Sequence, residues 1–104
     1  MDKQQRGLLM VEQEESEKKI TEIKNKLMGM GQILKELGNA MLSKSENIIF
    51  SNAPSGLGDA PIDFMHAPSF NWDKLPKFEQ IAKLIQELRN EEKRFLDIKR
   101  SLQG

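Results

Sequence analysis

Residues 20–41 read ITEIKNKLMGMGQILKELGNAM, and this stretch decides the fold class. Its apolar side chains recur at alternating intervals of three and four residues, the a and d positions of a heptad repeat. They are Ile20, Ile23, Leu27, Met30, Leu34, Leu37 and Met41. Because such spacing places side chains along one side of an α-helix, the stretch predicts a long amphipathic helix within residues 1–48, with an apolar seam over residues 20–41.

The heptad frame continues upstream of this stretch, but its positions become polar. Going towards the N-terminus, the frame meets Ser16, Gln13 and Leu9, of which only Leu9 is apolar. We therefore expect the first turns of the helix to be exposed or frayed. Acid–base pairs spaced four residues apart, such as Glu14 with Lys18, add local support of about 0.3 kcal/mol each.

Three glycines lie inside the best heptads, namely Gly29, Gly31 and Gly38. Each costs on the order of 1 kcal/mol relative to alanine in a helix interior. Gly31 and Gly38 occupy the same e position one heptad apart, where small residues allow a neighbouring helix to approach closely. The alternative is a kink or a break of the helix at residues 28–31.

A second helix is predicted over residues 73–104, with Asp73 as its N-cap and Pro76 in its first turn. Its frame runs through positions 81, 84, 88, 91, 95, 98 and 102, of which only Glu91 is polar. Phe78 and Ile85 lie outside this frame and widen the apolar stripe beyond that of a two-stranded coiled coil. Such a wide stripe indicates contact with more than one partner helix. The predicted packing residues are Phe78, Ile81, Leu84, Ile85, Leu88, Phe95, Ile98 and Leu102.

Residues 49–72 form the connector between the two helices, and the segment is rich in Pro and Gly. No amphipathic period continues through it, so no helix or strand is expected there. Five of its side chains are more apolar than a solvated linker requires: Ile62, Phe64, Met65, Phe70 and Trp72. Two interpretations stay open, because these side chains either dock on the sides of the helices or form a motif that binds another protein.

Together these segments predict an all-α fold, a helical hairpin of two long coiled-coil-type helices. In the antiparallel pairing, Phe95 and Ile98 are expected near Ile20 and Ile23. A two-helix hairpin buries only one side of each helix and is marginal at this size. Completion as a four-helix bundle by oligomerisation is therefore expected.

The composition indicates no chemistry of its own. Sixteen basic and sixteen acidic residues cancel, so no net field attracts nucleic acid or an anionic membrane. No apolar run reaches the roughly 18 residues of a membrane span. Cysteine is absent, His66 lacks companion metal ligands, and Ser55 lacks the structural setting of a nucleophile. We expect no enzymatic activity, no catalytic, cofactor-binding or metal-binding residues, no cofactor and no nucleic-acid partner.

These expectations favour a soluble intracellular protein, cytoplasmic by default and with a nuclear location open, that acts through other proteins. The leading hypothesis is a structural or adaptor protein that forms homodimers or hetero-oligomers through its coiled-coil helices. The alternative is a chaperone-like or regulatory protein that binds a client through residues 52–72.

Overall fold

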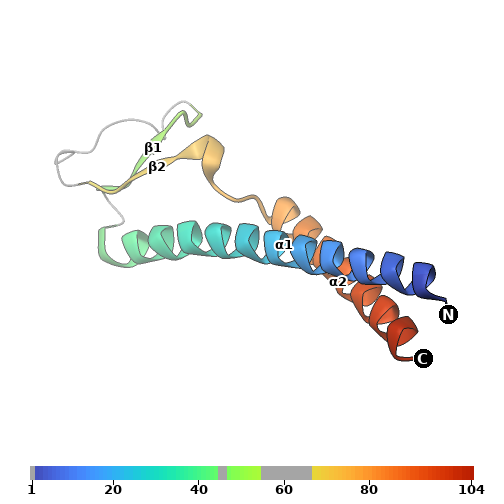
Figure 1. Cartoon of the computed structure of the whole chain (residues 1–104). Helices are drawn as coiled ribbons and strands as arrows, with labels where there is room; N and C mark the ends of the chain where they lie inside the picture. Colours follow the sequence, from blue (N-terminus) through green and yellow to red (C-terminus); the bar gives the residue numbers. More distant parts are fainter. Residues whose placement is uncertain (1, 45–46, 55–66) are drawn as a thin grey trace. The chain divides into compact units, whose positions relative to one another are not determined.

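The computed structural model describes residues 2–44, 47–54 and 67–104 of the chain, and these are mostly helical. The element order is α1 (Lys3–Lys44), β1 (Ile49–Ser51), β2 (Ser69–Asn71), the 3-10 helix η3 (Trp72–Lys74) and α2 (Phe78–Gln103) (Figure 1). The prediction of two long helices is confirmed. By its contacts the chain divides into a helical unit, Met1–Met28 with Phe78–Gly104, and a strand unit, Gly29–Lys77.

Helix α1 has a well-formed start. The Asp2 carboxylate accepts a hydrogen bond from the Gln5 amide at 2.7 Å, and the Asp2 carbonyl accepts one from the Arg6 amide at 3.0 Å. These bonds satisfy amides that a helix N-terminus leaves without an intrahelical partner. The helix then continues unbroken through Gly29 and Gly31, so the helix break considered at residues 28–31 is not present.

Burial along α1 follows the heptad frame further upstream than its apolar residues do. Within the frame the less exposed positions are 9, 13, 16, 20, 23, 27, 30, 34 and 37, and beside the frame Ile33, Gly38 and Ala40 are also less exposed. Ser16 is 0% exposed, and its hydroxyl donates to the Glu91 carbonyl of α2 at 3.4 Å. The expectation of exposed first turns was therefore wrong at Gln13 and Ser16, because a small side chain allows the second helix to approach closely.

Helix α2 begins at Phe78, later than the predicted start at residue 73. Asp73 lies in η3, where the Asn71 side chain accepts from the Asp73 amide at 3.0 Å and acts as the cap. Leu75 is extended, with φ −68° and ψ 131°. Proline disfavours the helical region for the residue before it and lacks an amide hydrogen, so Pro76 separates the 3-10 turn from α2.

Within the helical unit the two helices run antiparallel, and the N-terminus of α1 lies at the same end as the C-terminus of α2 (Figure 1). Less exposed positions of α2 recur at 81, 84, 88, 91, 95, 98 and 102. Ile20 and Phe95 line one groove, in line with the expected antiparallel pairing. Ser16 and Glu91 make a direct polar contact between the two helices.

The strand unit holds an element that the all-α prediction lacked. Strands β1 and β2 pair in parallel, with Ile49 opposite Ser69, Phe50 opposite Phe70 and Ser51 opposite Asn71. Parallel strands need a connection of a dozen or more residues, and residues 52–68 supply one. The expectation that residues 49–72 contain no strand was wrong, because three-residue strands form through a distant partner and leave no local periodicity.

Replacing Gly29, Gly31 or Gly38 by alanine is expected to stabilise the chain by about 0.5–1 kcal/mol at each position. A Cβ added at any of them meets nothing within 4 Å, so the gain in helix propensity has no steric cost within one chain. Urea unfolding followed by circular dichroism measures the change. Gly104→Ala, beyond the end of α2, is the control without effect. Destabilisation by the Gly31 or Gly38 variants would contradict the prediction.

Candidate protein-interaction surface

The helix pair buries little of its apolar seam. Among the described residues of the helical unit, Ile98 at 6% exposure is the only buried apolar side chain. Phe78 is 86% exposed, and Ile85 is also exposed. The other predicted packing residues of this unit are half-buried: Ile20, Ile23, Leu27, Ile81, Leu84, Leu88, Phe95 and Leu102. One helix therefore covers the other only in part.

The part of α1 that belongs to the strand unit is also only partly buried. Met30, Leu34 and Leu37 are half-buried, and Met41 is exposed. Ala40, which is outside the predicted packing set, is buried at 8% exposure. The a/d frame therefore locates the less exposed side of α1. The most buried position in this part of the helix is Ala40, which lies next to the frame.

A groove of about 680 Å³ runs along one side of the helix pair. Its apolar floor consists of Ile20, Phe95 and Leu96. Thr21 and five charged side chains line the rest: Glu14, Glu17, Lys18, Lys24 and Glu92. The groove therefore combines an apolar surface with flanking charges of both signs, which is the chemistry that an amphipathic helix presents to a partner.

Additional apolar side chains flank this groove. An α-helix turns 100° per residue, so Met10 and Met28 lie on the side of α1 that carries Glu17 and Lys24. By the same geometry, Phe78 and Ile85 share one side of α2 with Leu96. All five apolar residues are exposed. We call this side of the helical unit the groove face: the groove together with Met10, Met28, Phe78 and Ile85.

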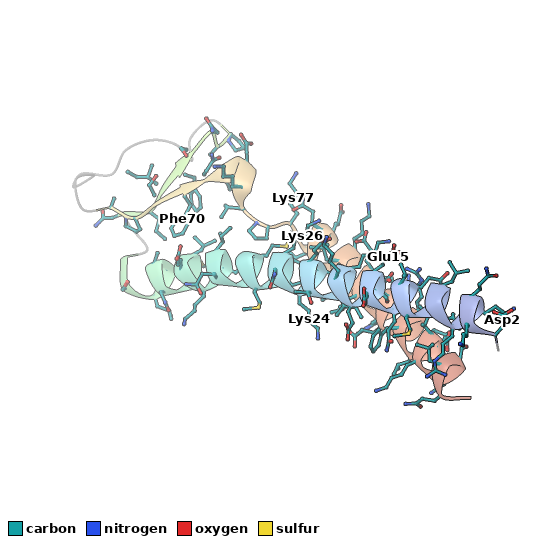
Figure 2. All side chains as sticks on the ribbon, viewed as in Figure 1. Asp2, Glu15, Lys24, Lys26, Phe70 and Lys77 are labelled. Carbon is teal, nitrogen blue, oxygen red and sulfur yellow. The ribbon has the colours of Figure 1, made fainter. Side chains whose placement is uncertain are left out.

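A hollow on the opposite side of the helix pair is mostly polar. The hollow there is lined by Lys19, Glu22, Lys26, Glu87, Asn90 and Glu91, and Ile23 is its one apolar residue. Figure 2 shows Lys24, which lines the groove, on the other side of α1 from Glu15 and Lys26. Phe78 and Met28, the two most exposed apolar side chains among the described residues of the helical unit, thus lie on the groove face, whereas Leu8 and Val11 line a separate hollow near the start of α1.

Sequence reasoning missed Met10, Met28 and Leu96, because all three lie outside the heptad frame. A signal was present: the side chains on this side of α1 also recur at intervals of three and four residues, through positions 10, 14, 17, 21, 24 and 28. Their mixed polarity conceals the pattern from a search based on apolar residues alone.

Charge pairing within the helical unit is sparse. Within the helical unit, Arg94 and Glu91 form an ion pair at 3.0 Å. Glu91 therefore has two roles, since its carbonyl also accepts from Ser16. The predicted pairing of Glu14 with Lys18 is not formed in the described part of the chain. The charged side chains along the groove are thus available to a partner.

A second apolar surface lies in the strand unit. The Phe50 ring lies 6.3 Å from the Phe70 ring and 5.7 Å from the Trp72 ring, with an edge-on angle of 89° to the latter. Trp72 is still 38% exposed. The Asn71 side chain, capping η3, also accepts from the Asn52 side chain at 3.4 Å, and Asn52 has a left-handed φ of 59°. These bonds fix the position of Trp72 beside Phe50.

The structure thus brings Phe70 and Trp72 of the predicted connector motif together around Phe50, which sequence reasoning did not include. The other members of that motif, Ile62, Phe64 and Met65, lie outside the described residues. Ser55 and His66, which we considered for chemistry, lie outside them as well.

Phe50→Ala is expected to remove both ring contacts and to cost about 1–3 kcal/mol of local stability, at about 0.5–1.5 kcal/mol for each aromatic pair. Trp72 is the only tryptophan, so its fluorescence and near-ultraviolet circular dichroism report this change without labelling. A shift of Trp72 emission towards that of a solvated indole is the expected result. Phe78→Ala, in the helical unit, is the matched control. Equal spectra for both variants would contradict the aromatic cluster.

None of the helices in the described ranges has the combination of length and apolar character that crossing a membrane requires. A scan against protein-family models gave no match, and searches among curated proteins and solved structures gave none either.

Proposed function

We propose that this chain is a non-enzymatic structural or adaptor protein that acts by helix-mediated association, either with itself or with helices of other proteins. The observation that supports the proposal is the incomplete burial of the helix pair, in which Ile98 is the only buried apolar side chain among the described residues of the helical unit.

Burial of apolar surface is the main favourable term in folding and association, at about 25 cal/mol for each Å² removed from water. Half-buried Leu, Ile and Phe side chains along both helices leave part of this free energy unused. A further helix laid against the pair would recover it. Association through helices is therefore the use to which this surface is best suited.

Sedimentation velocity, with circular dichroism at matched concentrations, tests the proposal. The expected result is an average mass that rises with concentration, or a stable complex with a helical partner chain, together with an increase in thermal stability. A chain that is folded and monomeric over the full range, and that binds no helical partner, would rule the proposal out.

A second candidate function is a chaperone-like or regulatory protein that binds an extended client segment. One supporting observation is the exposed indole of Trp72, which lies beside Phe50 of strand β1. A second is that a two-stranded sheet presents edges to which a further strand can add. Suppression of the aggregation of reduced insulin is a suitable assay. If the chain binds clients in this way, the wild-type protein suppresses aggregation and the Trp72→Ser variant does not. If the leading proposal holds instead, the wild-type protein shows no suppression and the Trp72→Ser variant keeps its assembly.

A further inference from the structure

We infer that the groove face is a homodimer interface, on which a second copy of this chain places its own groove face, rotated about a two-fold axis. This inference rests on the proposed function and adds to it the surface, the partner and the relative orientation of the two copies.

The apolar surface sets which side is used. Met10, Met28, Phe78, Ile85 and Leu96 are exposed and lie on the groove face, whereas the opposite hollow contains one apolar residue. Met28 is 71% exposed and Phe78 is 86% exposed, so neither is covered within its own chain. A partner that covers the groove face removes Met28 and Phe78, the two most exposed apolar side chains among the described residues of the helical unit, from water in one step.

The charges along the groove set the partner and its orientation. Glu14, Glu17 and Lys18 line the end nearer the N-terminus of α1, and Lys24 lines the other end. Glu92 of α2 adds an acidic side chain near the first end, since its neighbour Glu91 contacts Ser16, so acidic side chains are in excess there. Ten residues separate Glu14 from Lys24, about 15 Å along a helix axis. A two-fold axis through the groove reverses its direction, so the acidic end of one copy meets the basic end of the other. The groove is therefore complementary in charge to a second copy of itself.

The surface area that such a dimer would bury is that of a reversible complex. From Met10 to Met28 the face is roughly 27 Å long, and two helices of about 10 Å diameter make it roughly 20 Å wide. Each copy then covers about 540 Å² and the pair about 1,100 Å², which lies at the lower limit of specific interfaces. The chain carries no net charge, so no long-range repulsion opposes the encounter. The dimer should therefore form with measurable concentration dependence.

Charge reversal tests the orientation. The first variant combines Glu14→Lys with Glu17→Lys, and the second is Lys24→Glu. In a two-fold dimer each variant places like charges on both ends of its groove, so self-association should weaken about tenfold or more relative to wild type. An equimolar mixture of the two variants places opposite charges at both ends, and its association should return to within a few-fold of the wild-type value. Sedimentation equilibrium measures all three.

The control variant combines Glu15→Lys with Glu22→Lys. It changes the net charge by the same amount on the same helix, but Glu22 lines the opposite hollow and Glu15 lies on the other side of α1 from Lys24 (Figure 2). Its association should stay within a few-fold of wild type. Since all five reversed side chains are exposed, far-ultraviolet circular dichroism should show unchanged helix content in every variant.

The outcomes separate this inference from the proposed function. A wild-type chain that self-associates while the charge-reversed variants associate equally well overturns the groove face as the interface and leaves the proposed function standing. Failure of the mixture to recover overturns the two-fold orientation. A wild-type chain that is monomeric at every concentration overturns the inference, and the proposed function then depends on co-assembly with other chains alone.

Discussion

Truncation of Ile98 to alanine is expected to lower the free energy of unfolding by about 2–4 kcal/mol, the range for removing a buried aliphatic side chain. Ile98 is the one apolar side chain of the helical unit that is buried among the described residues. Its loss leaves a cavity where α2 packs on α1, and no second apolar side chain of this unit is buried in the part of the chain that the structure describes. Urea unfolding followed at 222 nm measures the effect.

Two matched variants make this prediction specific. Ile98→Val removes one methyl group and should cost about 0.5–1.5 kcal/mol. Leu8→Ala removes as much side chain from a position that is 66% exposed on α1, and it should change stability by about 0.5 kcal/mol or less. If Ile98→Ala and Leu8→Ala cost the same, packing at Ile98 does not stabilise the helix pair.

Introducing leucine at Ser16 is expected to destabilise the protein by about 1–3 kcal/mol through overpacking. The heptad frame alone predicts the opposite, because leucine is the preferred residue at a d position of a coiled coil. The structure decides between them: Ser16 is 0% exposed and donates to the Glu91 carbonyl across the helix contact. A larger side chain there must push α2 away from α1.

Two control variants accompany Ser16→Leu, one at Ser16 itself and one at Gln13, the preceding position of the heptad frame. Ser16→Ala loses one long hydrogen bond of 3.4 Å and gains helix propensity, so its effect should stay within about 1 kcal/mol. Gln13→Leu places the same new side chain at a half-buried position and is expected to be neutral or stabilising. Stabilisation by Ser16→Leu in thermal unfolding would show that the two helices separate there without cost.

The sequence allowed prediction of those parts of the fold that a local repeat specifies. Alternating intervals of three and four residues predicted two long helices, and the burial pattern of α2 follows the frame from Ile81 to Leu102. The upstream limit of the helix contact was missed, because a frame built on apolar residues gives no weight to a serine. The tightness of a contact depends on the size of the side chain as well as on its polarity.

The remaining errors have their origin in distant contacts. Strand β1 is three residues long, and its partner β2 begins at Ser69, after the connecting residues 52–68. No window of residues around Phe50 contains the residues that pair with it. The start of α2 was misplaced for a local reason, since Asp73 lies inside η3, which Asn71 caps, and Pro76 delays the start of α2. The assignment of residues to an interface with a partner chain stays a prediction.

The order in which the chain supplies its elements has a consequence for building the protein from parts. A peptide that ends at residue 54 holds α1 and β1, and a peptide that begins at residue 67 holds β2, η3 and α2. The helical unit needs a helix from each peptide, and the parallel ladder needs a strand from each. Neither peptide can complete either unit without the other, so this chain is suited to splitting into two complementing fragments whose reassembly reports that they have met.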